Sequence, residues 1–255
     1  MEIGNDCRRP AVLAVLYVPK AFESRDGKIL DRTVPALATR LNQIYDRLWQ
    51  AYGPQHWWPA DGPLEVMVGA VLTQNTSWLR VERALANLKQ QGLLSVGKLY
   101  HTPTEDLAQI IRPVGYFNLK ARRLKNLIKL VAETYAENLQ AMSWTETNRL
   151  REELLAVRGV GAETADSILL YAFQRPVFVV DTYTRRVISR HGLCEETLGY
   201  NELQTLFMQH LEHDQSMFNE YHALLVRVGK PHCRREPRCQ GCPLEPILPH
   251  SFPER

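Results

Sequence analysis

The fold of this chain is decided by residues 150–186, which read LREELLAVRGVGAETADSILLYAFQRPVFVVDTYTRR. Apolar residues recur at helical spacing up to Val157, and Gly159 and Gly161 then interrupt the pattern. Glycine adopts positive φ and lets the backbone approach a ligand closely. The first N–H groups of a helix that begins at Ala162 would have no intrahelical acceptor and could bind a phosphate. The stretch therefore predicts either a phosphate-binding hairpin between helices or an ordinary helical hairpin with a glycine cap.

An isolated acidic residue, Asp181, follows the hairpin. It comes directly after the apolar run 177–180 and stands next to hydroxyl and arginine side chains that can bind phosphate. One interpretation is a helix N-cap, for which aspartate is a preferred residue. The other is a reactive carboxylate held beside a phosphate backbone. The two interpretations are compatible, and with the hairpin they indicate a site where DNA meets a carboxylate.

This stretch resembles the helix-hairpin-helix and aspartate signature of the endonuclease III superfamily of DNA glycosylases. Residues 64–88, LEVMVGAVLTQNTSWLRVERALANL, resemble the family's helix and glutamine-bearing loop. Residues 114–127, VGYFNLKARRLKNL, resemble its Gly-aromatic-aromatic-Asn-x-Lys-Ala segment. The resemblance extends from about Val34 to Leu248, in the family's order of motifs.

The resemblance implies an all-α, bilobal helix-hairpin-helix DNA glycosylase fold with a C-terminal cysteine loop. The central lobe would comprise residues 63–173 and carry the hairpin. The second lobe would comprise residues 34–62 and 174–255, and residues 1–33 would form an N-terminal extension. DNA would lie across the cleft, with Asp181 at its mouth. The implied DNA contacts are Gln74, which would enter the gap left by an extruded base, and Asn75, Lys120, Gly159, Val160, Gly161, Thr164 and Arg185.

The hairpin departs from the family's lyase members at one position. Those members place a lysine two residues after the second hairpin glycine, and Glu163 stands there in this chain. A carboxylate cannot form the Schiff base with the sugar that leads to strand cleavage. The resemblance then implies hydrolysis, with Asp181 stabilising positive charge on the deoxyribose and orienting or deprotonating the attacking water. Glu163 would assist catalysis, contact the base or simply be a surface acid.

Other residues resemble the superfamily branch called 3-methyladenine DNA glycosylase III, which sandwiches a flipped alkylated purine between aromatic rings. An electron-poor purine stacks well on indole, with a cation-π component if it is charged. One side of the pocket would come from the Trp57-Trp58-Pro59 segment and the other from Trp78. The implied base-pocket residues are Trp57, Trp58, Pro59, Trp78 and Lys230. Alternatively, the tryptophans anchor the core and Lys230 contacts phosphate or solvent.

A run of cysteines, Cys233, Cys239 and Cys242, has the spacing C-x5-C-x2-C. Such spacing is typical of a metal or cluster site, and the resemblance implies a 4Fe-4S cluster that clamps a basic loop against DNA. The family's fourth cysteine would stand where this chain has Leu248. One iron could stay open, zinc could replace iron, or the site could be degenerate. Candidates for the missing ligand are His232, His250, Cys7 and Cys194.

Three further patterns predict helix ends. Apolar residues between Leu37 and Trp49 indicate an amphipathic helix that ends near Gly53. Residues 102–105, TPTE, and residues 143–146, SWTE, read as capping boxes at the starts of two more helices. We therefore expect helices from about residues 37, 103 and 144.

Composition agrees with a DNA-binding globular protein. The net charge is only +3, but basic residues cluster in residues 120–129 and 234–238, and local patches matter more than the sum. The 5 cysteines, with three in a metal-like run, indicate a reducing compartment. No run approaches the roughly 18 apolar residues of a membrane span, and no signal peptide is expected. We expect a monomer in the cytoplasm, associated with the nucleoid.

Three hypotheses of function follow. The first is a monofunctional glycosylase that releases alkylated purines from duplex DNA. The second is an endonuclease III-like glycosylase that acts on oxidised or mismatched pyrimidines and has AP lyase activity. The third, of another class, is a DNA-lesion-binding protein without catalysis, against which the presence of Asp181 argues.

Overall fold

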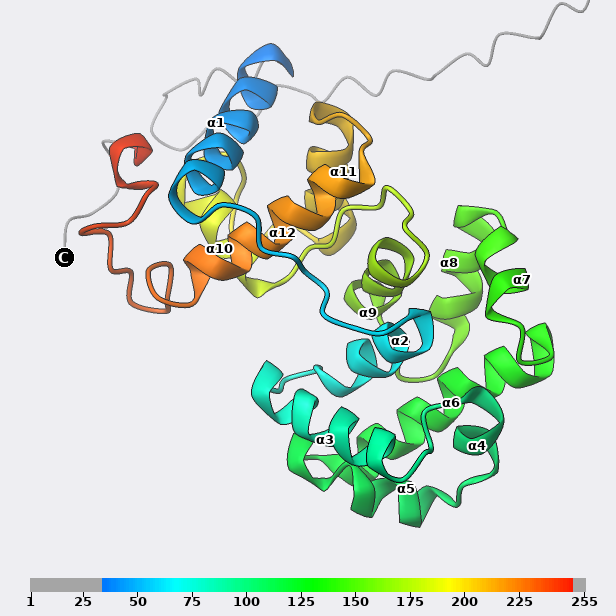
Figure 1. Ribbon diagram of the computed structural model, residues 1–255. Helices are drawn as coiled ribbons and strands as arrows, with labels where there is room; N and C mark the ends of the chain where they lie inside the picture. The colour runs from blue at the N-terminus through cyan, green and yellow to red at the C-terminus, as the bar shows by residue number, and fades with distance from the viewer. Residues whose placement is uncertain (1–33, 250–255) are drawn as a thin grey trace, which may run out of the picture. The chain divides into compact units, whose positions relative to one another are not determined.

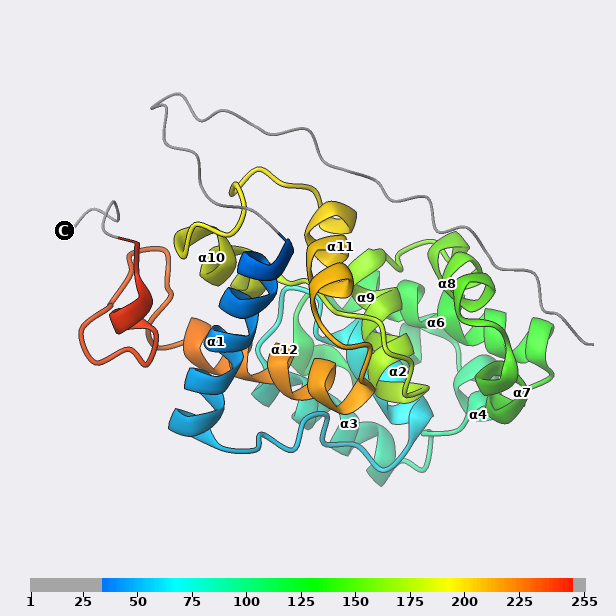
Figure 2. The same ribbon diagram turned by 90° about the horizontal axis from the view of Figure 1, so that it is seen from above.

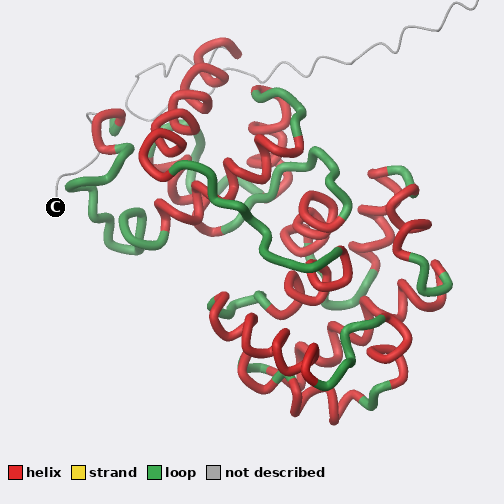
Figure 3. Tube along the Cα trace, in the orientation of Figure 1, coloured by secondary structure: helices red, strands yellow, loops and turns green. Residues whose placement is uncertain are grey.

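The computed structural model describes residues 34–249 of the chain. The predicted N-terminal extension, residues 1–33, lies outside the described residues, as do Cys7 and His250. The described part is helical, with loops and without a strand, which confirms the all-α prediction (Figure 1, Figure 3). None of its helices is long and apolar enough to cross a membrane.

The elements follow one another in a single helical series. In chain order they are α1 (Val34–Tyr52), α2 (Pro63–Leu72), α3 (Trp78–Gln90), α4 (Val96–His101), α5 (Thr104–Ile110), η1 (Arg112–Val114), α6 (Phe117–Tyr135), α7 (Leu139–Trp144), α8 (Thr147–Ala156), α9 (Ala162–Ser167), η2 (Ile168–Ala172), α10 (Thr182–Arg190), α11 (Tyr200–His210), α12 (Gln215–Gly229) and η3 (Glu245–Ile247). The η2 segment is a π-helical continuation of α9.

A first hydrophobic core surrounds α2. This helix is almost entirely apolar and is buried from Glu65 to Leu72, as expected of a helix with neighbours on every side. Helices α3, α6 and α9 and the η2 segment pack against it, while α4 and α5 pack on α6. The loop before α2 and the hairpin before α9 are thereby fixed to one body.

A second core is built from α1, α10, α11 and α12, which lie together in Figure 2. Phe178 stacks on Phe207 at its centre, with the ring centroids 3.8 Å apart. The η2 segment contributes to both cores, because Leu169 belongs to the first and Leu170 to the second. The predicted lobe boundaries, residues 63–173 against residues 34–62 and 174–255, remain a prediction.

Both predicted capping boxes are wrong, although the helix that follows each is present. Ser143 lies inside α7, and its hydroxyl donates to the Gln140 carbonyl at 2.7 Å; Glu146 is the N-cap of α8. Thr102 ends α4, and its hydroxyl donates to the Lys98 carbonyl at 2.7 Å. Each hydroxyl bonds backward to the preceding turn instead of forward to the next helix. The predicted end of the first helix near Gly53 is confirmed, because α1 ends at Tyr52.

Candidate DNA-glycosylase site

The helix-hairpin-helix has the predicted form, with α8 ending at Ala156 and α9 beginning at Ala162. Gly159 has a φ of 102°, and a Cβ there would lie 2.3 Å from Cγ of Arg123, so only glycine fits. Gly161 is the extended N-cap of α9 and has open space around it. Val160 is buried in the first core, so only its backbone is available to a ligand.

The glutamine-bearing loop is tied to this hairpin. Gln74 donates from Nε2 to the Gly159 carbonyl at 3.1 Å and to Oγ1 of Thr164 at 3.0 Å. Arg123 donates to the Gln74 side-chain oxygen at 2.5 Å. Asn75 is exposed at the loop tip with a φ of 52°. The loop and hairpin therefore form one surface, on which the role of Gln74 in filling a base gap remains a prediction.

Lys120 does not have the exposure that a direct DNA contact needs. The residue is 2% exposed, and its ammonium donates to the carbonyls of Leu72 at 2.8 Å and Val114 at 3.1 Å and to the hydroxyl of Thr76. Burial, with a smaller contribution from the charge of Arg123, lowers the pKa of Lys120 to about 8. The Lys120 ammonium instead joins the glutamine loop to the start of α6, which corrects the predicted contact of Lys120 with DNA.

Asp181 is the N-cap of α10, and one carboxylate oxygen accepts from the Thr184 backbone N–H at 2.7 Å. The other oxygen lies 3.8 Å from Nε2 of His222, a buried residue of α12. On the far side of the imidazole, Nδ1 is 2.5 Å from the Tyr171 hydroxyl. Three elements thus converge on one carboxylate, which is itself mostly buried.

The protonation of this group follows from its burial. Burial, together with the charges of Asp181 and Glu220, raises the pKa of Tyr171 well above its ordinary value, so the phenol stays a hydrogen-bond donor. Burial lowers the pKa of His222 despite the opposing effect of Asp181, so the ring is neutral. A neutral ring that accepts from Tyr171 at Nδ1 carries its proton on Nε2, which faces Asp181. At 3.8 Å this N–H faces the carboxylate but does not form a hydrogen bond to it.

Glu163 lies in the first turn of α9. Desolvation of its carboxyl, together with the negative charge of Asp181, raises the pKa of Glu163 to about 7. Glu163 therefore lies within range of the charge of Asp181, and its part in a shared catalytic site remains a prediction.

The three predicted tryptophans gather in one cluster. Ring centroids are 5.1 Å apart for Trp57 and Trp58, 4.9 Å for Trp57 and Trp78, and 5.0 Å for Trp58 and Trp78. The planes of Trp58 and Trp78 are at 88°, so these rings contact each other edge-on and would have to part to sandwich a base. Pro59 is exposed and lines a surface hollow with Trp78.

The cluster connects to the carboxylate through Tyr171. The ring of Trp58 packs on that of Tyr171 with centroids 5.3 Å apart. Room for the indole exists because residue 69 is glycine: a Cβ there would lie 3.0 Å from Trp58. The contacts run from Trp58 through Tyr171 and His222 to Asp181.

Two predicted site residues stand apart from these contacts. Lys230 is exposed just beyond α12, next to Gly229, which packs on Tyr183 of α10. Arg185 donates to the carbonyls of Glu196, at 3.3 Å, and Leu198, so it holds the loop before α11. The structure therefore gives Arg185 an internal role, while the role of Lys230 remains a prediction.

Sequence patterns did not single out Tyr171 or His222, and they placed Tyr116 in a family motif without giving it a role in the site. Tyr171 and His222 are isolated polar residues in apolar stretches of sequence. Nothing in those stretches indicates that the two side chains contact each other in the fold. Tyr116 is 76% exposed at a φ of 45°, an uncommon combination for an aromatic residue. Its position next to the loop held by Lys120 makes it a further candidate for contact with DNA.

Comparison with known proteins identifies the family. The description "HhH-GPD superfamily base excision DNA repair protein" matches residues 68–213. The chain belongs to this superfamily. Its members include base excision repair DNA glycosylases, and the hairpin and Asp181 lie within the matched range.

Individual relatives agree with that assignment. The chain is 48% identical over 205 residues to a protein of Methanocaldococcus jannaschii named as a DNA repair glycosylase, covering 80% of this chain and 93% of the relative. It is 30% identical over 183 residues to Endonuclease III of Bacillus subtilis, covering 71% of this chain and 78% of the relative. Among solved structures, 3-methyladenine DNA glycosylase (MagIII) of H. pylori bound to 1,N6-ethenoadenine has a TM-score of 0.65 at 28% identity, covering 76% of this chain and 97% of that one.

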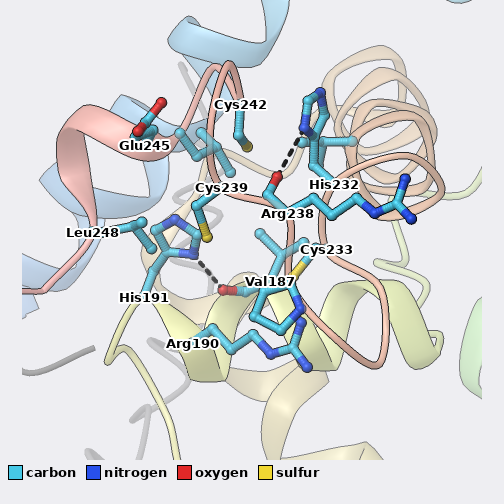
Figure 4. A pocket seen from close by; sticks show the side chains of 13 residues that line it. Val187, Arg190, His191, His232, Cys233, Arg238, Cys239, Cys242, Glu245 and Leu248 are labelled. Carbon is cyan, nitrogen blue, oxygen red and sulfur yellow. Dashed lines mark hydrogen bonds between the residues drawn. The ribbon is translucent and has the colours of Figure 1, made fainter. Parts of the chain in front are cut away.

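The C-terminal loop brings together the three cysteines that the sequence predicts as cluster ligands. Cys233, Cys239 and Cys242 line one small cavity, which Figure 4 shows with Leu248 on its wall. Within residues 34–249, no three His, Cys, Asp or Glu side chains converge closely enough to hold a single metal ion. A 4Fe-4S cluster does not require the thiolates to converge on one point, because each thiolate binds a different iron. The cavity therefore fits a cluster in its thiol content, while a fourth cysteine is missing.

Proposed function

We propose that this protein is a monofunctional DNA glycosylase that hydrolyses the N-glycosidic bond of alkylated purines in duplex DNA. The observation that carries the proposal is the series of contacts from Trp58 through Tyr171 and His222 to Asp181. It joins an aromatic surface suited to a base to a carboxylate suited to the sugar. The likeness to the H. pylori enzyme bound to 1,N6-ethenoadenine supports a purine substrate.

Base recognition would begin with extrusion of the nucleotide. A glycosylase reaches its target only when the base leaves the stack, and a damaged base that pairs poorly costs least to unstack. Gln74, Asn75 and Tyr116 lie on the surface that would face the resulting gap. The tryptophans would then separate and take the purine between their rings, with an added cation-π attraction for a charged alkylpurine.

Asp181 would act on the sugar. As the glycosidic bond breaks, positive charge develops on the deoxyribose, and an ionised carboxylate nearby stabilises it. The same carboxylate orients or deprotonates the attacking water. His222 would help to position Asp181, because its Nε2–H faces the carboxylate at 3.8 Å. Tyr171 fixes the tautomer of His222.

Hydrolysis without strand cleavage follows from Glu163. The lyase members of the superfamily hold an amine at this position, and a carboxyl cannot form a Schiff base. Because the pKa of Glu163 is about 7, both protonation states are populated near neutrality. Glu163 would serve as donor or acceptor to the purine and would add no covalent step.

A second candidate is an endonuclease III-like activity on oxidised or mismatched pyrimidines with AP lyase activity. The 30% identity to the B. subtilis Endonuclease III favours it. A lysine outside the hairpin would then have to supply the amine.

Duplexes that carry one lesion each distinguish these activities. Single-turnover reactions would compare an alkylated adenine, an oxidised pyrimidine, uracil and a thymine opposite guanine, each with and without borohydride. We expect the fastest release for the alkylated adenine and no borohydride-trapped covalent complex. Faster release of the oxidised pyrimidine with a trapped complex would support the second candidate, and binding without release from any duplex would support a lesion-binding protein.

We further propose that Cys233, Cys239 and Cys242 hold a 4Fe-4S cluster. When bound, the cluster supplies a rigid structural crosslink, and no catalytic step passes through it. Arg190 donates to the carbonyls of Arg234 at 2.6 Å and Arg235 at 3.0 Å, so the loop is already bound to α10. We propose that the protein acts as a monomer on duplex DNA in the cytoplasm.

A further inference from the structure

A cluster held by three thiolates leaves one iron without a protein ligand. The superfamily's fourth cysteine position is occupied by Leu248, which has no donor atom. Among the described residues, the side chains around the cavity are the ones placed to supply that ligand. Two histidines, His191 and His232, line this cavity with the cysteines.

His191 has the arrangement of a metal-binding histidine. The residue is 4% exposed, and its Nδ1 lies 2.7 Å from the Val187 carbonyl. A carbonyl only accepts, so Nδ1 carries the proton and Nε2 of the neutral ring has a free lone pair. This Nε2 is buried and has no hydrogen-bond partner; the Leu244 carbonyl is near the ring but forms no hydrogen bond of ordinary geometry with it. A backbone carbonyl on one nitrogen and a metal on the other is the usual pattern of a ligating imidazole.

The position of the ring agrees with this assignment. In Figure 4 the His191 ring is drawn between Leu248 and Cys239, both of which line the cavity. His191 and Leu248 are therefore both part of the wall of the cavity that the three cysteines line. A buried polar atom without a hydrogen-bond partner costs free energy. Coordination of iron by Nε2 of His191 would remove that cost.

The other candidates fit less well. His232 is partly exposed, and its Nδ1 lies 3.1 Å from the Arg238 carbonyl. Cys194 is buried but is not among the residues that line the cavity. Cys7 and His250 lie outside the described residues.

We propose that Nε2 of His191 is the fourth ligand of the cluster, which is then bound by three thiolates and one imidazole. The inference rests on the cluster proposed above and gives that cluster a specific task. His191 directly follows α10, and Asp181 directly precedes it. The 9 residues of α10 span roughly 14 Å at 1.5 Å per residue. The cluster would hold one end of the helix whose other end carries the proposed catalytic carboxylate.

Spectroscopy of the anaerobically purified full chain tests the ligand directly. Protein containing 57Fe would be examined by Mössbauer spectroscopy, and protein with 15N-labelled histidine by pulsed EPR after one-electron conversion of the cluster to a paramagnetic state. We expect one iron that differs from the other three and a strong hyperfine coupling to a histidine nitrogen. His191→Ala should lose the coupling and about one iron per chain, His191→Cys should give a four-thiolate spectrum, and His232→Ala should match the unaltered protein.

The possible failures are distinguishable. Iron and sulfide absent from the unaltered protein would overturn both the cluster and its histidine ligand. A cluster with no histidine coupling, or only the weak coupling of a hydrogen-bonded ring, would overturn the ligand and leave the cluster standing. The unaltered protein alone yields this answer, so poor folding of His191→Ala does not affect it.

Discussion

At the scale of single residues, two neutral groups prepare Asp181 for its proposed role. His222 is held by Tyr171 with a nitrogen directed at the carboxylate, and the same Tyr171 ring packs on Trp58. Tyr171 therefore contacts the tryptophan cluster through its ring and, through its hydroxyl, the histidine that faces Asp181.

Replacement of Tyr171 by Phe isolates that hydroxyl. The ring keeps its packing on Trp58, but His222 loses the partner that fixes its tautomer. We expect single-turnover base release to slow by about three- to tenfold, the equivalent of one hydrogen bond of about 1 kcal/mol. Tyr221→Phe is the control, because this buried tyrosine donates to the Leu41 carbonyl at 2.8 Å in the second core. It should lower the free energy of unfolding without altering base release; equal loss of activity in both variants would contradict the role of Tyr171.

Glu163 makes stability depend on pH. Its pKa in the folded protein, about 7, is above the ordinary value of 4.5, so folding favours the protonated form. The associated stability is fully present below about pH 4.5 and is lost as pH rises through about 7. Glu163→Gln should remove this decline from the pH dependence of the free energy of unfolding, measured with urea. An unchanged pH profile would contradict the raised pKa of Glu163.

At the scale of elements, the two glycines of the hairpin differ in how much space surrounds them. Gly159→Ala places a Cβ against Arg123 at positive φ, so we expect a loss of about 1–2 kcal/mol in the free energy of unfolding. Gly161→Ala enters open space at ordinary φ and should leave that free energy nearly unchanged. It should instead weaken DNA binding, because the methyl group stands where a phosphate would approach. Equal DNA affinity for Gly161→Ala and the unaltered chain would exclude the hairpin as a DNA contact.

The sequence predicts elements best where the signal is local. Glycines locate the hairpin, and aspartate locates the start of α10. The basic run at residues 120–129 predicts a DNA-binding face and wrongly includes Lys120 in it. Lys120 belongs to the buried side of α6, together with Ala121 and Leu124. The contact of Trp58 with Tyr171 joins segments far apart in the chain, and no local pattern encodes it.

At the scale of the whole molecule, a buried ion pair connects α8 and α9 to α11. Asp166 is 0% exposed and accepts from Arg151 at 2.6 and 3.0 Å, from Tyr200 at 2.9 Å and from Gln204 at 2.8 Å. Gln204 also donates to the Phe178 carbonyl at 2.7 Å, in the segment that leads to Asp181. This network fixes the hairpin relative to α10.

Arg151→Met would leave a buried carboxylate without its cation. We expect a loss of about 3 kcal/mol in the free energy of unfolding, because the desolvated charge keeps only neutral donors. Arg149→Met breaks an exposed pair with Glu153 and should cost less than about 1 kcal/mol. Denaturant titrations of both variants provide the comparison, and similar losses would show that the Asp166 network does not hold the two cores together.

The central claim is that Asp181 drives hydrolytic release of alkylated purines. The most direct measurement is chromatography of bases released from methylated duplex DNA by the unaltered protein and by Asp181→Asn, with the same DNA run on gels before and after alkali. Asparagine is also a good N-cap, so α10 should persist in the variant. We predict free 3-methyladenine and nicks only after alkali for the unaltered protein, and release at least about 100-fold slower for Asp181→Asn. Undiminished release by the variant, or nicks without alkali, would contradict the account.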